Sequence, residues 1–219
     1  MIVKDAGGGD FEQPEAGTYS AKSYKLIDIG TQAGEYQGKQ TMRRQVILGW
    51  ELDEPMSDGR PFAVSKFYTA SLSEKATLRH DLESWRGRAF TEDELGGFDL
   101  QAILGKPCML TLTKTDKGKV KVTAVSKLPK GMQAMKAANP ILYFSLDDFD
   151  PEVFAGLSDG IKRMIMQSPE YQAAVRGGGG HGVPDEAFGS EDDIPFAHCI
   201  AGNTGLGYAL PGLAGHHVL

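Results

Sequence analysis

The chain has 219 residues, 41% of them hydrophobic, which is enough for one substantial core with flanking tails. Its formal net charge of −6 argues against a nucleic-acid binder, because such proteins usually carry an excess of Lys and Arg. The distribution of charge reverses this argument: residues 17–130 hold 18 Lys and Arg against 14 Asp and Glu, whereas the other residues hold 5 against 15. A mildly basic body therefore carries acidic ends.

The cysteine content and the N-terminal segment suggest a compartment. Cys108 and Cys199 are far apart and form no CxxC pair, which predicts a reducing environment without a disulfide framework. The first residues contain no basic segment followed by an apolar one, and no window approaches the roughly 18 apolar residues of a membrane span. We therefore expect a soluble, cytoplasmic protein without a membrane partner, in an oligomeric state that the sequence leaves open.

Three strands are predicted first. Residues 1–16 are rich in Gly and acidic residues, which predicts a flexible N-terminus before the body begins at residue 17. Residues 18–29 and 41–53 alternate polar with apolar side chains and predict two strands, with a polar loop over 30–40 between them. A turn leads to a third strand over 61–70, which completes a meander.

The periodicity then changes from two to 3.6. Ser71 and Glu74 have the spacing of a capping box, and the next apolar side chains recur at helical spacing: Leu78, Leu82 and Trp85. We expect a helix here that packs through one narrow apolar stripe.

Two short helical segments and a hairpin follow. Residues 91–94 predict a second capped turn, and residues 98–105 predict a short helix. Alternating runs over 106–115 and 119–127 predict a hairpin, in which Gly118 can take the positive φ of the turn.

This order of elements predicts a mainly β fold: a five-stranded OB barrel over residues 17–130, with a helical insertion between strands three and four. An unspecified small β-barrel or an α+β domain stays open as the alternative. Residues 131–176 predict a helical extension, with Asp150 before Pro151 as one helix start, that packs on the barrel or folds on a partner. Residues 177–219 join a flexible Gly-rich linker, an acidic tail segment and a terminal extension.

The search for catalytic and metal-binding motifs is nearly empty. No phosphate-binding loop, dinucleotide fingerprint, HExxH or GxSxG motif is present. Asp148, Asp150 and Glu152 alternate as in half of an EF-hand loop, but Val153 and Asp159 occupy the positions of its Gly and its bidentate Glu. We therefore expect no enzyme, no cofactor and no metal site.

The remaining chemistry is that of a surface for single-stranded nucleic acid, which needs cations along the backbone path and aromatic faces for bases. The second and third strands supply Arg43, Arg44, Trp50, Phe62, Lys66 and Tyr68. The two loops that border an OB groove add Tyr36, Lys39, Lys114, Lys117, Lys119 and Lys121.

Strand parity decides which of these rings can stack on bases. Phe62, Lys66 and Tyr68 share one face and Phe67 lies on the other, so the charge of Lys66 predicts that the first face meets solvent. Trp50 shares its face with apolar residues and is compatible with a core position. In the alternative interpretation the rings belong to the core, and the Lys-rich hairpin is a solvated edge that discourages aggregation.

A family resemblance appears at residues 190–196, SEDDIPF. The segment EDDIPF resembles the acidic tip of bacterial single-stranded-DNA-binding proteins, where a flexible tail ends in Asp-Asp-Ile-Pro-Phe and docks on replication, recombination and repair enzymes. The resemblance implies partner binding by Asp192, Asp193, Ile194, Pro195 and Phe196. In that family Phe is the last residue, whereas here residues 197–219 follow it.

The body, over roughly residues 17–175, resembles bacteriophage-encoded DNA-binding replication proteins through FDLQAILGK and LDDFDPEVF. Together the resemblances imply a non-catalytic protein of the host cytoplasm that binds single-stranded DNA regardless of sequence. It would protect the strand and recruit enzymes of DNA replication, recombination and repair. The alternative is a β-barrel adaptor of a phage replication or recombination complex, without a primary DNA-binding role.

Overall fold

A computed structural model describes residues 12–36 and 38–177. The segments at 1–11 and 178–219, which include the acidic tail, lie outside the described residues. The elements in chain order are β1 (Gly17–Tyr36), β2 (Lys39–Pro55), β3 (Pro61–Thr69), α1 (Thr77–Arg86), α2 (Glu92–Gly96), the 3-10 helix η1 (Leu100–Ile103), β4 (Pro107–Lys114), β5 (Val120–Ser126), β6 (Leu142–Phe144), α3 (Pro151–Gly156), α4 (Asp159–Gln167) and α5 (Pro169–Gly177).

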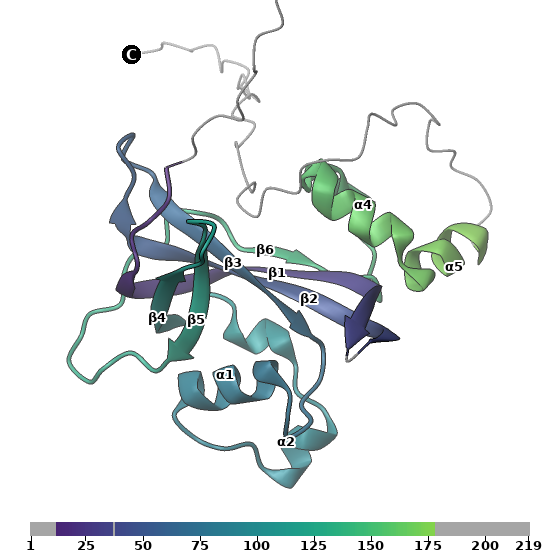
Figure 1. The fold of residues 1–219 in the computed structure, drawn as a ribbon, viewed down its shortest axis with the longest axis horizontal. Coiled ribbons are helices and arrows are strands. Elements are labelled where there is room, and N and C mark those ends of the chain that lie inside the picture. Colours follow the sequence, from purple (N-terminus) through teal and green to yellow (C-terminus); the bar gives the residue numbers. More distant parts are fainter. Residues whose placement is uncertain (1–11, 37, 178–219) are drawn as a thin grey trace, which may run out of the picture.

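The protein is mainly β, and the six strands of its described residues belong to one sheet. Five strands pair antiparallel in the order β3-β2-β1-β4-β5, and β6 pairs with β1 in parallel. Because each of these neighbouring pairs is antiparallel, the two edge strands, β3 and β5, run in the same direction. Some Cα atoms of β3 lie within 8 Å of Cα atoms of β5. Among the described residues no hydrogen-bonded ladder joins these edges, so the sheet is curled but open (Figure 1).

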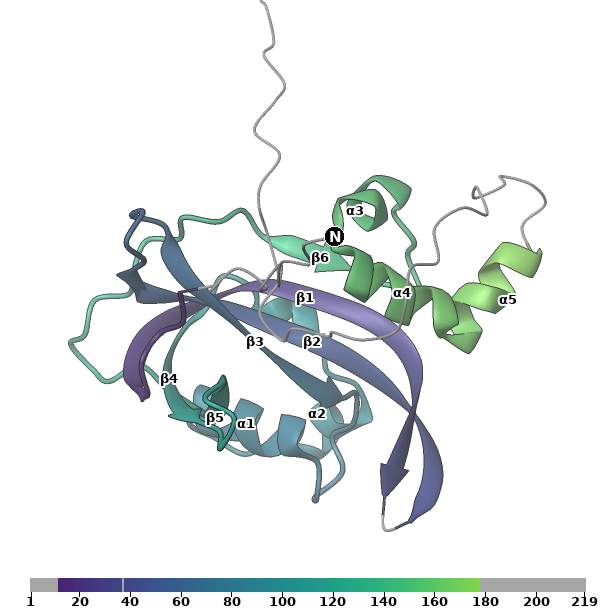
Figure 2. The same cartoon turned by 45° about the horizontal axis from the view of Figure 1, so that its top comes forward.

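The first two strands are longer than the sequence pattern predicts. Residues 30–40, expected as a loop, continue β1 and β2 as a paired hairpin that ends at Tyr36 opposite Lys39, and this hairpin extends away from the body (Figure 2). Most of these side chains are exposed, so the alternation that marks a half-buried strand is missing. The expected loop was wrong because backbone pairing, not an apolar face, forms this part of the sheet.

A first core lies between the curled sheet and α1. Leu78, Leu82 and Trp85 are buried there, which confirms the apolar stripe of the predicted helix. The predicted cap at Ser71 was wrong: the helix begins at Thr77, and Ala76 provides no side-chain cap. The next capped turn is confirmed, because Thr91 and Glu94 form a reciprocal capping box at the start of α2.

A second core lies on the opposite face of β1 and β2. It is formed by Ile27, Ile29, Ile47, Phe144, Leu157, Ile161, Ile165 and Tyr171. Figures 1 and 2 agree that α4 and α5 lie on the side of the sheet opposite to α1. The helical extension therefore packs on the sheet, and it contributes β6 and α5, which the sequence pattern did not predict.

Polar contacts join this extension to the sheet. The Glu170 carboxylate accepts hydrogen bonds from the Thr31 backbone N–H at 2.9 Å and the Thr31 hydroxyl at 2.6 Å. The Glu51 carboxylate, which is buried, accepts from the backbone N–H groups of Ala138 and Asn139 at 3.0 Å and from the Asn139 amide at 2.9 Å. These paired acceptors add to the second core in joining the extension to the sheet.

Candidate nucleic-acid interface

Arg44, predicted to contact nucleic acid, is held inside an ion-pair network. Its guanidinium pairs with Asp28, and a second pair reaches Asp147 Oδ2 at 2.8 Å. The hydrogen bonding that Arg44 donates to Asp28 is the largest of the effects that raise the pKa of Arg44, while burial lowers it. Through these two ion pairs, Arg44 on β2 is joined to β1 and to the segment after β6. Because both carboxylates already neutralise its guanidinium, Arg44 offers little charge to a phosphate.

The face of β3 that carries Phe62, Lys66 and Tyr68 points into the first core. Phe62 is 6% exposed and Tyr68 3% exposed, so the prediction that this face meets solvent was wrong. Lys66 can lie on this face because Asp81 on α1 pairs with its charge: Asp81 Oδ2 lies 2.6 Å from Lys66 Nζ. The same oxygen accepts a hydrogen bond from the Tyr68 hydroxyl at 2.7 Å. Burial, followed by the charge of Asp81, raises the pKa of Tyr68.

Trp50 is fully buried in the same core, 6.1 Å from the Trp85 ring between centroids. A base cannot stack on Trp50, Phe62 or Tyr68 unless the core opens. The alternative interpretation, in which these rings are core residues, is therefore correct for all three. Parity identified the residues that share a face, but the packing of α1 decided which face is buried.

The hairpin between β1 and β2 carries the next group of predicted residues. Lys39 and Arg43 are exposed, and Met42 beside them is 59% exposed. Tyr36 pairs with Lys39 through the backbone. The hairpin thus presents cations on an extended arm of the sheet (Figure 2).

The hairpin between β4 and β5 brings together the four predicted lysines, Lys114, Lys117, Lys119 and Lys121, all of them exposed. Its turn contains Gly118 at φ 74°, as the sequence predicted. Within the described residues none of these four ammonium groups has an ion-pair partner, in contrast to Arg44 and Lys66. We call this group the hairpin lysines.

The outer face of β3 is a feature that the sequence reasoning did not favour. Ala63, Ser65 and Phe67 alternate along this face and are exposed, with Phe67 at 37%. The alternation of side chains along β3 does carry this signal in the sequence, because it places Phe67 on the side opposite Tyr68. The neighbouring outer face of β2 carries Ile47 and Glu51, both buried under residues 131–177. Of these two neighbouring strands, β3 is therefore the one whose outer face is exposed.

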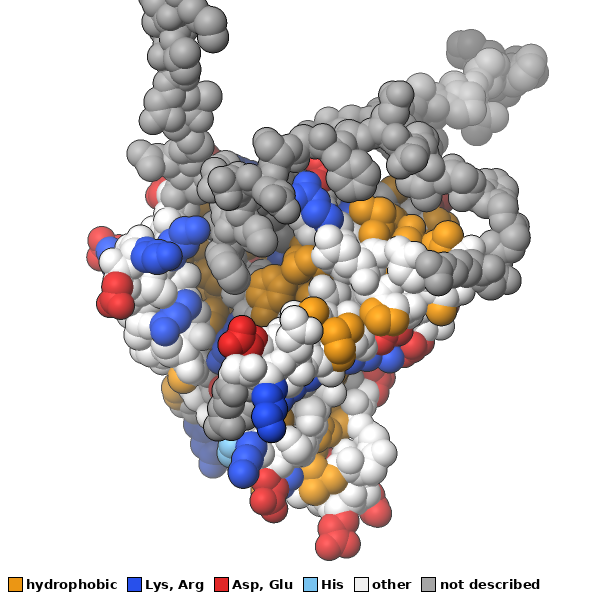
Figure 3. Space-filling model, turned by 45° about the vertical axis from the view of Figure 1, so that its right-hand side comes forward, with side chains coloured by type: hydrophobic (Ala, Val, Ile, Leu, Met, Phe, Trp, Pro, Cys, Tyr) orange, Lys and Arg blue, Asp and Glu red, His pale blue; other side chains and the backbone are white. Residues whose placement is uncertain are grey.

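Basic side chains do not form one continuous patch on the side of the molecule drawn in Figure 3. Lys and Arg gather there in separate groups, with uncharged and acidic surface between them. On this side, electrostatic attraction of a phosphate backbone would therefore act through local clusters rather than through a single basic stripe.

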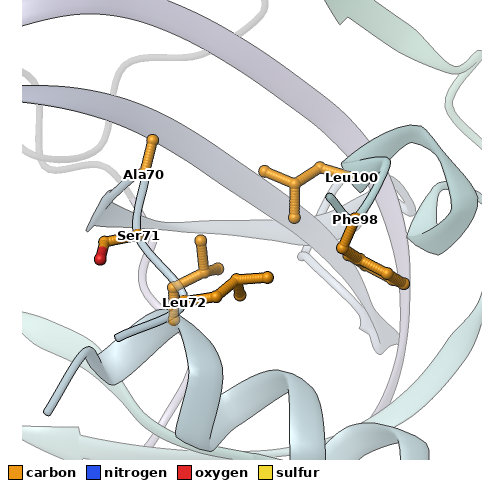
Figure 4. Close-up of a pocket in the computed structure, with 6 residues that line it drawn as sticks. Ala70, Ser71, Leu72, Phe98 and Leu100 are labelled. Carbon is orange, nitrogen blue, oxygen red and sulfur yellow. The ribbon is translucent and has the colours of Figure 1, made fainter. Parts of the chain in front are cut away.

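Two apolar hollows open on the described surface. One, of about 190 Å³, has Ala70, Ser71 and Leu72 on one side and Phe98 and Leu100 on the other (Figure 4). The second, of about 200 Å³, lies beside Tyr24 and residues 139–142. Neither is lined by a cluster of charged residues.

Among the acidic residues that alternate as in an EF-hand loop, Asp150 has a structural role. Asp150 caps α3, where its Oδ1 accepts the backbone N–H groups of Glu152 at 2.8 Å and Val153 at 3.1 Å. This confirms Asp150 as a helix start. In the described part of the chain, no three His, Cys, Asp or Glu side chains form a group that could hold a metal ion.

The predicted partner-binding residues Asp192, Asp193, Ile194, Pro195 and Phe196 lie outside the described residues. No protein-family model matches the chain, and no curated protein matches its sequence. None of the described helices combines the length and apolar character needed to cross a membrane.

Proposed function

We propose that the protein binds single-stranded DNA without sequence preference. The observation that carries this proposal is the cluster of hairpin lysines, which expose four ammonium groups within one turn and its flanks. Unpaired cations on an exposed hairpin attract a phosphate backbone through counterion release, and this attraction does not depend on base sequence.

The curled sheet is interpreted as an OB-type barrel whose last seam lacks hydrogen bonds. Its strand order and the equal direction of β3 and β5 support this interpretation, as does the position of α1, η1 and α2 in the chain between β3 and β4. OB folds bind oligonucleotides on the face of strands two and three and with the loops that follow strands one and four. In this chain, the same places are the outer face of β3, the β1–β2 hairpin and the hairpin lysines.

The proposed DNA path differs from the one that the sequence predicted. Trp50, Phe62 and Tyr68 are excluded from it by burial, and Arg44 and Lys66 by their carboxylate partners. The path instead follows Lys39, Arg43, Phe67 and the hairpin lysines.

The acidic tail supplies the proposed recruitment role in DNA replication, recombination or repair. Phe196 and Ile194 can fill an apolar pocket of a partner while Asp192 and Asp193 steer toward a basic rim. A chain truncated after Phe196 should bind its partner more tightly than the full chain, since the free carboxylate at Phe196 then becomes available. Equal binding of the two chains to the same partner would contradict this tail mechanism.

A protein-interaction adaptor is the second candidate, and the burial of the three predicted rings favours it over a stacking platform. The two functions separate in a pull-down from nuclease-treated lysate, because an adaptor keeps its partners when DNA is removed. An adaptor would also bind dT oligonucleotides no better than a control protein of equal charge does.

The decisive experiment for DNA binding is fluorescence anisotropy with a labelled dT 30-mer over a range of salt concentrations. We expect binding at low salt that weakens steeply, by about 0.7 in the logarithmic slope for each phosphate neutralised. Absence of any binding at low salt would refute the proposal. Incubation of labelled single strands with Mg²⁺ should leave them intact, which tests the expectation that the protein is not an enzyme.

A further inference from the structure

A cluster of aromatic rings reaches the surface on the helical side of the sheet. The Phe149 ring lies against three others, with centroids 5.6 Å, 5.4 Å and 5.9 Å away: those of Phe144, Phe154 and Tyr171. Phe144 and Tyr171 are buried, whereas Phe149 is 38% exposed. Val175 follows Tyr171 by one turn of α5 and is 51% exposed. The cluster thus ends in an apolar surface that the described residues leave uncovered.

Carboxylates flank this apolar surface. Asp148 and Asp150 lie on either side of Phe149 in the chain, and Glu152 follows in the first turn of α3. All three acidic side chains are exposed. Among the described residues none of the three has an ion-pair partner, in contrast to Asp147. We call this surface the acidic patch, formed by Asp148, Phe149, Asp150, Glu152 and Val175.

The loop between β5 and β6 has the opposite charge. The Pro129 carbonyl accepts the Met132 backbone N–H at 3.2 Å, and Gly131 between them has φ 85°, so residues 129–132 form a tight turn. The turn presents Met132, which is 46% exposed. Three exposed lysines lie in and beside the turn: Lys127, Lys130 and Lys136. Within the part of the chain that the structure describes, these lysines have no ion-pair partner. We call them, together with Met132, the basic loop.

The basic loop and the acidic patch lie toward opposite ends of the molecule. In Figures 1 and 2 the loop between β5 and β6 projects at the left, whereas α5, with Val175, lies at the right. The basic loop is therefore too far away to cover the acidic patch of its own chain. A contact between two different surfaces of identical chains is heterologous, and it joins copies head to tail.

We propose that the basic loop of one copy docks on the acidic patch of the next copy. Complementarity on both sides identifies a second copy as the occupant, because three lysines of the loop match three carboxylates of the patch. Each set of charges accompanies exposed apolar side chains, and the thioether of Met132 is suited to lie against the Phe149 ring. Charge pairs around an apolar contact also fix which surfaces meet. The inference is independent of the proposed DNA binding, since none of these residues lies on the proposed DNA path.

Sedimentation velocity of the nuclease-treated full chain tests this contact. Because small interfaces are weak, the protein is measured at low salt up to about 0.5 mM. We expect species larger than the monomer that grow with concentration and dissociate at about 1 M salt, where charges are screened beyond about 3 Å. Lys130→Gln combined with Met132→Gln should weaken association at least about tenfold. Lys39→Gln combined with Met42→Gln makes the same changes at exposed positions of the β1–β2 hairpin, and this control should associate like the wild type.

A mixture of two defective variants tests whether the contact is head to tail. Val175→Lys, at an exposed position of α5, places a cation on the acidic patch opposite the basic loop and should block association of that variant alone. An equimolar mixture of this variant with the variant altered at Lys130 and Met132 should form a 1:1 dimer and nothing larger. Only one intact loop and one intact patch can meet in that mixture.

Several outcomes would overturn this inference. The first is a wild-type chain that stays monomeric at low salt. Association that neither variant weakens, or that the control weakens equally, would show that another surface or net charge alone is responsible. A mixture of the two variants that remains monomeric would exclude the head-to-tail contact. Failure of the wild type to bind the dT 30-mer, with association intact, would instead overturn only the proposed DNA binding.

Discussion

Lys66 on β3 and Asp81 on α1 form an ion pair of 2.6 Å that joins the sheet to the helix beneath it. The pair is largely covered, with 18% of the Lys66 side chain and 16% of the Asp81 side chain exposed. Because Asp81 also accepts the Tyr68 hydroxyl, one carboxylate satisfies two polar groups at the edge of the core. This arrangement makes Lys66 and Tyr68 part of the folded core.

Tyr68→Ala should therefore destabilise the protein by roughly 3 kcal/mol or more, since it removes a buried ring. Urea unfolding followed by the fluorescence of the two buried tryptophans, Trp50 and Trp85, would measure the loss. DNA affinity of the folded fraction should match the wild type. If Tyr68→Ala kept the stability of the wild type and lost DNA binding, Tyr68 would instead belong to the binding surface.

The hairpin lysines should contribute to binding without contributing to stability. Lys117→Gln and Lys119→Gln should each reduce the salt slope of dT binding by about 0.7, since each removes one phosphate contact. Their melting temperatures should stay within about a degree of the wild type, because exposed lysines without ion-pair partners add little to stability. Lys75→Gln removes the same charge elsewhere on the surface, and an equal effect of this control would show that net charge alone matters.

Gly30 should tolerate no side chain. It has φ 70°, and a Cβ atom there would lie 2.5 Å from Ser168 Cβ at the junction between α4 and α5. Gly30→Ala should cost about 1–2 kcal/mol for the left-handed backbone and a further 1–3 kcal/mol for overpacking. Gly118→Ala is the matched control, because Gly118 has φ 74° and open space around it. Equal losses in urea unfolding would contradict the close contact with Ser168.

Acid should weaken the fold partly through Glu94. Hydrogen bonds from Arg88, then from the Thr91 N–H, lower the pKa of Glu94 from 4.5 to about 2. Because this pKa is lower in the folded state, the stabilisation is complete above about pH 4.5 and is lost as pH falls toward 2.

Thermal melts of the wild type and Glu94→Gln across this range test the linkage. The difference between their melting temperatures should be constant at neutral pH and shrink below about pH 4.5. If the difference between the two melting temperatures stayed constant down to pH 2, the substitution would act on stability through side-chain shape rather than through the charge of Glu94.

Local signals in the sequence predicted the elements that depend on near neighbours. The stripe of Leu78, Leu82 and Trp85 marks α1, the pair Thr91 and Glu94 marks α2, and Gly118 marks the turn between β4 and β5. Each signal lies within a few residues of the structure that it specifies. Because such interactions join near neighbours in the chain, a pattern of spacing is enough to identify them.

The sequence by itself determined a mainly β body, the parity of each strand and the exposed lysines of one hairpin. Only the tertiary structure decided which face of each strand is buried, because α1 covers one side of the sheet and residues 131–177 cover the other. Strand parity groups side chains into two sets, but burial depends on the layer that packs against each set. For this reason Tyr68 belongs to the core and Phe67 to the surface.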